Sequence, residues 1–135
     1  MGRSILAVVA GFVVTGLLVV GTTAGVTAAF PGAFDARGVP TGMGMLLFQH
    51  LYVAVYATFG CWLAARLAPS RPMLHAMIVG ALGIAVNAAN PAIWDMYPWW
   101  SNMISLGGPI LFARIAGTIR EGQLARASGT TMATA

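Results

Sequence analysis

Six side chains that can exchange hydrogen bonds interrupt the apolar stretches of this sequence: Gln49, His50, Tyr52, Asn87, Asn90 and Asn102. Amide, phenol and imidazole groups each donate and accept, and an imidazole can also bind a metal. Such groups are costly in an apolar medium unless they find partners, so they normally point toward one another. The pattern predicts a polar pocket, or a network of hydrogen bonds, formed by these six residues.

His50 allows the most specific chemistry of the six. A neutral imidazole in an apolar helix can be the axial ligand of a haem or chlorin. The other histidine, His75, falls near the opposite end of its helix, and the single cysteine, Cys61, lacks the spacing of a metal site. Three interpretations of the pocket stay open. In the first, the pocket is an internal network in which His50 bonds to Asn87 or to a tyrosine. In the second, it is a site for a haem, a chlorin or a quinone-like molecule. In the third, it is part of a transport path.

The composition places these residues in a membrane protein. Of the 135 residues, 59% are hydrophobic and 7% are charged, whereas an ordinary soluble domain has roughly 25% charged residues. A chain this short cannot bury so much apolar surface in its own core. The net charge of +4 comes from arginines scattered at the ends of apolar segments. Because they form no basic face, nucleic acid is not an expected partner.

Four apolar runs predict membrane-spanning helices at residues 4–30, 42–68, 73–90 and 99–119. Crossing a bilayer takes about 20 helical residues, and a lone chain in lipid forms either helices or a closed barrel. The runs lack the alternation of barrel strands. Short connections make consecutive helices antiparallel neighbours. We therefore predict an all-α bundle of four transmembrane helices over residues 1–120, followed by a polar, flexible tail at 121–135.

The arginines predict the orientation of this bundle. Arg37 falls on one side, and six arginines fall on the other: Arg3, Arg66, Arg71, Arg114, Arg120 and Arg126. The positive-inside rule then puts both termini in the cytoplasm and the chain in the inner, cytoplasmic membrane. One alternative stays open, in which the first apolar run is a signal peptide cleaved near residues 26–28, leaving three helices.

Small residues recur at helical spacing on two of the predicted helices. Gly11, Gly21 and Gly25 lie on the first, and Gly80 and Gly83 lie on the third. Such positions let helix backbones approach closely, which is a main source of helix association in lipid. They predict packing faces, directed either at other helices of the chain or at another subunit or a second copy.

Aromatic residues gather between the third and fourth helices: Trp94, Tyr97, Trp99 and Trp100. Trp and Tyr favour the headgroup level of a membrane. Pro91 and Pro98 flank this segment, and proline is suited to stopping one helix and beginning the next. The segment therefore predicts an interfacial belt where two helices reach the membrane surface.

The sequence contains no pattern that predicts catalysis. Its acids, Asp35, Asp95 and Glu121, fall in separate segments, so they form no carboxylate pair. It also lacks a phosphate-binding loop or a metal-binding motif. We therefore expect a non-catalytic accessory subunit that packs against a larger membrane complex. The alternatives are a membrane protein with an outward-facing ligand pocket at His50, and a small oligomeric channel or transporter.

Overall fold

The structure is a computed structural model that describes residues 2–133, apart from the side chains at 91–93 and 129–133. Its elements are α1 (Gly2–Ala29), a 3-10 turn η1 (Pro31–Ala33), α2 (Met43–Leu67), α3 (Pro72–Ala88), α4 (Pro91–Met96) and α5 (Trp99–Ala133). The predicted all-α class is confirmed for these residues. Helices α1, α2 and α5 are long and apolar enough to cross a membrane, and α3 is a shorter apolar helix.

Two helical segments go beyond the sequence-based expectation. The short helix α4 occupies the connection before Trp99, and α5 continues through the expected flexible tail as far as Ala133. Residues 120–128 consist mostly of Arg, Glu, Gln, Leu and Ala, which are good helix formers, and this composition favours the continuation. Residue 1 and residues 134–135, at the outer limits of the predicted domain and tail, lie outside the described residues.

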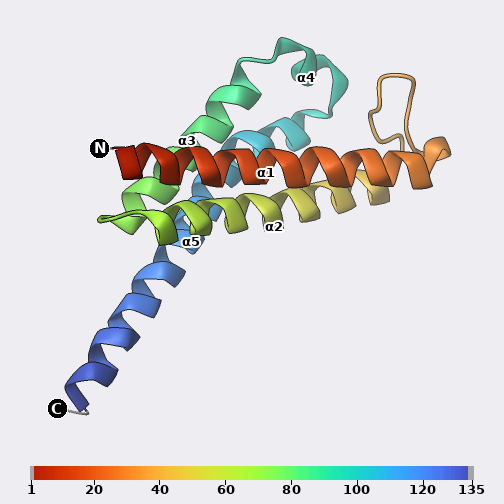
Figure 1. Ribbon diagram of the computed structural model, residues 1–135. Helices are drawn as coiled ribbons and strands as arrows, with labels where there is room; N and C mark the ends of the chain where they lie inside the picture. Colours follow the sequence, from red (N-terminus) through yellow and green to blue (C-terminus); the bar gives the residue numbers. More distant parts are fainter. Residues whose placement is uncertain (1, 134–135) are drawn as a thin grey trace.

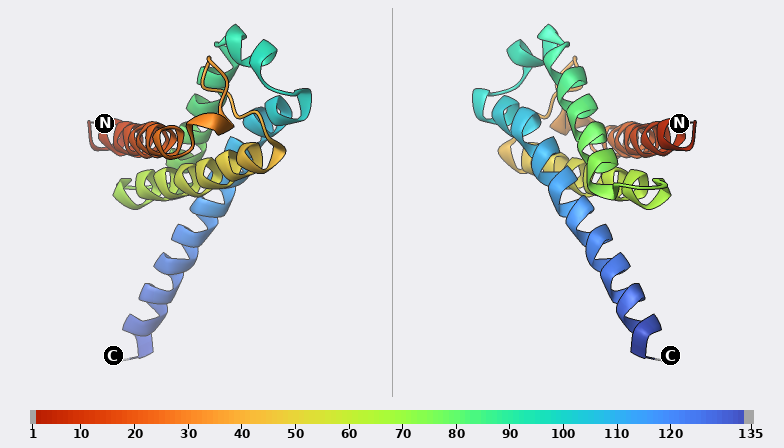
Figure 2. Two further views of the ribbon diagram at one scale, coloured as in Figure 1. Left: turned by 90° about the vertical axis from the view of Figure 1, so that its right-hand side faces the viewer. Right: turned by 90° about the vertical axis from the view of Figure 1, so that its left-hand side faces the viewer.

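Helices α1, α2, α3 and α5 form two antiparallel pairs (Figure 1). Helix α1 lies along α2, α3 lies along α5, and the second pair crosses the first obliquely. Helix α2 also contacts α3 and α5, so it joins the two pairs. The later half of α5 leaves the other helices and projects away from them (Figure 2).

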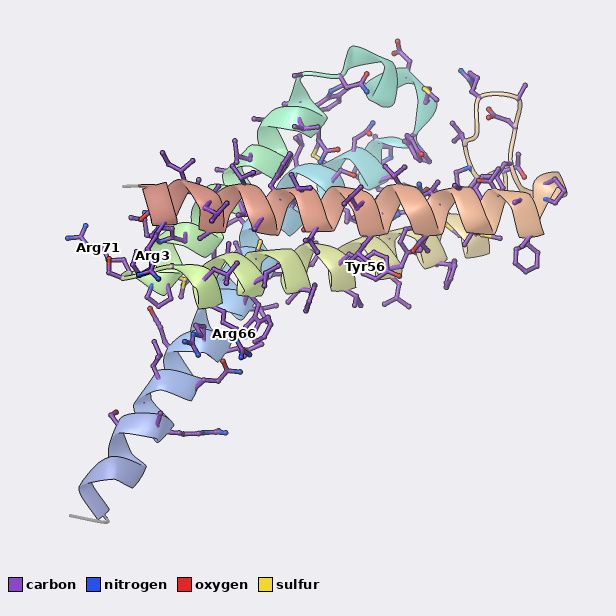
Figure 3. The ribbon with its side chains drawn as sticks, viewed as in Figure 1. Arg3, Tyr56, Arg66 and Arg71 are labelled. Carbon is purple, nitrogen blue, oxygen red and sulfur yellow. The ribbon has the colours of Figure 1, made fainter. Side chains whose placement is uncertain are left out.

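The bundle has two distinct ends. At one, which we call the arginine end, α1 begins, α2 ends and α3 begins. Arg3, Arg66 and Arg71 lie toward this end (Figure 3). At the other, which we call the pocket end, α1 and α3 end while α2 and α5 begin.

Small residues make up the core in the half of the bundle nearer the arginine end: Cys61, Ala64, Ala65, Ala76, Val79, Ala113 and Ala116. Glycines bring the backbones into contact beside this core. A Cβ on Gly80 would lie 2.7 Å from the Pro109 carbonyl oxygen, and one on Gly60 would lie 2.5 Å from that of Gly11. These positions therefore have no room for a larger side chain.

The glycines predicted to pack helices behave in two ways. Gly11 and Gly80 lie at close backbone contacts, and Gly83 faces the Pro109 ring, with its ideal Cβ position 3.6 Å from that ring. Gly21 and Gly25 have no atom of another described element within 4 Å of their Cβ positions. The GxxxG pair on α1 is thus uncovered by the rest of the described chain.

Hydroxyl groups join α1 to α2 in the half nearer the pocket end. The Tyr52 hydroxyl lies 2.7 Å from Thr23 Oγ1, and Thr22 Oγ1 donates to the Tyr56 hydroxyl at 3.0 Å. Figure 3 shows Tyr56 at the α1–α2 interface. In this half, hydrogen bonds between side chains connect the two helices, whereas close packing of small residues connects them in the other half.

A tight turn built on Asp35 connects these two helices. Its Oδ1 accepts the backbone N–H groups of Arg37 at 2.8 Å and Val39 at 2.9 Å. The Arg37 guanidinium pairs with Asp35 Oδ2 at 3.2 Å, and Gly38 supplies the positive φ of 77° that the turn needs. The Val39 N–H, followed by the Arg37 groups, holds the pKa of Asp35 below its ordinary value.

Candidate ligand-binding pocket

A cavity of about 310 Å³ lies between α2, α3 and α5, and Val19 of α1 also lines it. Its polar lining residues are Gln49, His50, Asn87, Tyr97, Ser101 and Ser105. Its other apolar lining residues are Val53, Ala57, Ile104, Pro109 and Phe112. All the lining residues are uncharged or, for His50, able to be neutral, so the cavity suits a neutral molecule with a polar group.

His50 projects from α2 toward α5, and both of its ring nitrogens are in contact with hydrogen-bonding partners. Nδ1 lies 2.8 Å from the Leu46 carbonyl oxygen, which can only accept, so Nδ1 carries the proton. In the neutral ring Nε2 then accepts from the Ser101 hydroxyl, 3.1 Å away. Trp100 packs against the ring, with centroids 5.8 Å apart.

This geometry disfavours the haem or chlorin interpretation. A metal on His50 would need the Nε2 lone pair, which Ser101 already uses. The cavity volume is also at the lower end of the roughly 300–1,000 Å³ of ligand pockets, which fits a single ring system better than a porphyrin.

Gln49 carries the least satisfied polar group of the cavity. Its Nε2 donates to the Tyr97 hydroxyl across a long 3.4 Å. Its Oε1 is buried and has no hydrogen-bond partner among the described residues. An unpaired buried acceptor costs about 1–3 kcal/mol. A ligand that reaches this oxygen and donates a hydrogen bond to it would remove that cost.

Asn87 compensates for a proline in the neighbouring helix. Pro109 has no N–H, so the Ser105 carbonyl loses the partner that an α-helix normally provides. Asn87 Nδ2 donates to this oxygen at 3.4 Å and to the Gly83 oxygen at 3.0 Å. Both acceptors are carbonyls, so Nδ2 must face them, and Oδ1 is the free end of the amide.

The other three residues of the predicted pocket lie elsewhere. Tyr52 turns to α1 and bonds to Thr23. Asn90 is exposed just beyond the end of α3, and its side chain makes no hydrogen bond within the described chain. Asn102 is buried and donates to the carbonyl oxygens of Trp94 and Tyr97, both at 3.3 Å. It ties α4 to the start of α5, and its Oδ1 is buried with no hydrogen-bond partner in the described part of the chain.

The predicted aromatic belt divides into two pairs. Trp94 and Trp99 are exposed, as an interfacial role requires. Tyr97 lines the cavity, and Trp100 packs against His50. Half of this belt therefore contributes to the site.

Sequence reasoning missed Ser101 and Pro109. Ser101 is 1% exposed and contacts His50, yet serine at the start of a helix is too common to predict such a role. Pro109 offered a usable signal, because proline inside a helix leaves a carbonyl oxygen without its donor. A neighbouring side-chain amide is a natural substitute donor.

No protein-family model, curated protein or solved structure matches the chain. Fold alone does not imply a function. The function must therefore come from the chemistry of the cavity and of the surface.

Proposed function

We propose that this protein is a non-catalytic membrane protein that holds a small, uncharged amphipathic molecule in the cavity between α2, α3 and α5. The observation that carries the proposal is the mixed lining, in which uncharged polar groups face a space walled by Val53, Ala57, Ile104 and Phe112. Ligand sites typically combine an apolar wall with a few placed polar groups. A quinone or phenolic ring matches this combination.

The proposal includes a transmembrane bundle of α1, α2, α3 and α5 with both termini in the cytoplasm. The lengths of α1, α2 and α5 support it. Helix α3, with 17 residues, is at the short limit of the range of about 17–25. Arg3, Arg66 and Arg71 lie toward one end, which the positive-inside rule assigns to the cytoplasm. The cavity then lies in the outer half of the bilayer.

The test is binding of a decyl-substituted benzoquinone and its hydroquinone to the protein in lipid nanodiscs. Quinones quench tryptophan fluorescence, and Trp100 lies beside His50 at the cavity. We expect saturable quenching by the quinone. Its displacement by the hydroquinone, whose hydroxyl can donate to Gln49 Oε1, should weaken about fivefold in Gln49→Leu, the effect of one hydrogen bond of about 1 kcal/mol. The same substitution removes an unpaired buried oxygen, so the empty protein should keep or gain stability.

Asn90→Ala is the matched control, because Asn90 is an exposed amide outside the cavity. It should bind the probes as the unsubstituted protein does. Quenching that rises linearly with the probe concentration in the membrane would show partitioning without a site. That result, or equal displacement by the hydroquinone in Gln49→Leu, contradicts the proposal.

A second candidate function is that of an accessory subunit of a larger membrane complex. The observation that favours it is the uncovered face at Gly21 and Gly25 on α1. Close helix contacts in lipid use small residues of this kind. After mild extraction, the protein should migrate with a larger complex on a native gel, and Gly21→Leu with Gly25→Leu should release it. Migration as a monomer before any substitution argues against this role.

A further inference from the structure

Two arginines and a tryptophan come together where α5 leaves the other helices. The Trp62 indole N–H of α2 donates to Gln123 Oε1 of α5 at 3.4 Å. Arg120 Nη1 donates to the same oxygen at 3.5 Å. The guanidinium carbon of Arg66 lies 5.1 Å from the centroid of the Trp62 ring. This cluster of Trp62, Arg66, Arg120 and Gln123 gathers two positive charges around two neutral groups.

No carboxylate of the described chain neutralises these two charges. The ion pair found among the described residues joins Arg37 to Asp35 in the turn between α1 and α2. Arg120 Nε is buried and has no hydrogen-bond partner among the residues that the structure describes. The Trp62 ring and the Gln123 amide compensate the guanidinium groups only in part. An anion at this position would provide the missing acceptor and the missing charge.

The surroundings favour the phosphate of a lipid. Guanidinium groups bind phosphate through paired hydrogen bonds. Arg66 lies in the last turn of α2, toward the same end as Arg3 and Arg71, which is headgroup level when the helices span a bilayer (Figure 3). Beside the cluster, a shallow hollow of about 560 Å³ on α5 is walled by Ile115 and Ile119 and is completed by Arg114, Thr118, Gly122, Gln123 and Arg126. A phospholipid has both an anion for the arginines and an apolar chain for this hollow.

We propose that Arg66 and Arg120 bind the phosphate group of an anionic phospholipid, whose acyl chain lies along Ile115 and Ile119 of α5. The lipid joins the end of α2 to α5, where the Trp62 N–H also connects the two helices through one long hydrogen bond to Gln123. Anionic lipids fit better than zwitterionic ones, because the headgroup cation of the latter offsets the phosphate charge near the two guanidinium groups.

Native mass spectrometry of the protein released from nanodiscs tests this site. Phosphatidylglycerol and phosphatidylcholine of matched chain length are supplied together. We expect retained phosphatidylglycerol in clear excess, and a loss of about tenfold in its affinity in Arg66→Gln and in Arg120→Gln, since hydrogen bonds to charged groups are the stronger ones. Arg120→Lys keeps the charge without the planar fork. Its affinity for phosphatidylglycerol should lie between that of the unsubstituted protein and that of Arg120→Gln.

Arg37→Gln is the control, because it removes one positive charge in the turn between α1 and α2, far along the chain from the cluster. It should retain phosphatidylglycerol fully. Circular dichroism establishes that each variant keeps its helices. Equal retention of the two lipids, or full retention by the Arg66→Gln, Arg120→Gln double variant, overturns the proposal. Displacement of the lipid by inorganic phosphate also overturns it, because the site would then recognise the free anion.

Discussion

The two halves of the bundle are held together by different interactions. Near the arginine end, alanines and glycines let the helices touch along their backbones. Near the pocket end, the contacts run through longer polar side chains, as in Asn87 with Ser105 and His50 with Ser101. Lipid removes the hydrophobic drive between helices, so close packing and hydrogen bonds must supply it. Polar side chains span wider gaps between helices than alanine and glycine do, and the cavity lies in the half nearer the pocket end.

The largest expected effect comes from filling the close-packed half. In Gly80→Leu the new Cβ would meet the Pro109 oxygen at 2.7 Å and the Ala113 Cβ at 2.9 Å, and neither the backbone oxygen nor the alanine can turn away. We expect a loss of about 2–3 kcal/mol in the free energy of unfolding. Titration with a denaturing detergent, followed by circular dichroism, measures it.

Gly21→Leu is the control for this comparison, because it places the same side chain on an uncovered face of α1. Its free energy of unfolding should change by less than about 0.5 kcal/mol, as is usual for surface substitutions. If the two variants lose similar stability, close backbone contact does not distinguish this half of the bundle.

A smaller effect is expected in the polar half, from Asn87→Ala. The Ser105 carbonyl would lose its substitute donor, which costs about 1–2 kcal/mol. In a Pro109→Ala background, residue 109 regains its N–H and can bond to Ser105 within the helix. The cost of Asn87→Ala should shrink there, with a coupling free energy of at least about 0.5 kcal/mol. Additive losses in the double-mutant cycle would contradict this role for Asn87.

The smallest effect concerns the Asp35 turn, which connects α1 to α2 near the pocket end. Because hydrogen bonds from the Val39 and Arg37 N–H groups lower its pKa, the ionised carboxylate stabilises the folded turn. This contribution is present above the ordinary pKa of 3.8 and is lost as the pH falls through the lowered value. The Val39 amide resonance in NMR spectra should shift in this acidic range, and Asp35→Asn should remove the titration.

The candidate site was predictable in part. Gln49, His50 and Asn87 line one cavity, because residues on apolar helices that need hydrogen bonds turn away from lipid. Tyr52 and Asn102 obey the same rule but find partners elsewhere, in Thr23 and in the carbonyl oxygens before α5. The spacing of polar residues along an apolar helix predicts that each polar side chain needs a hydrogen-bond partner. It does not predict which of several possible partners lies within reach.

The helical class follows directly from the sequence, because its long apolar runs with few charges are suited to helices that satisfy their own backbone. So do the positions where most helices begin and end, through proline, glycine and polar breaks. Tertiary structure alone decided that Gly80 is packed while Gly21 is uncovered, and that Asn87 serves the carbonyl orphaned by Pro109. Both outcomes depend on how the helices pack against one another, and that packing arises from contacts between residues far apart in the chain.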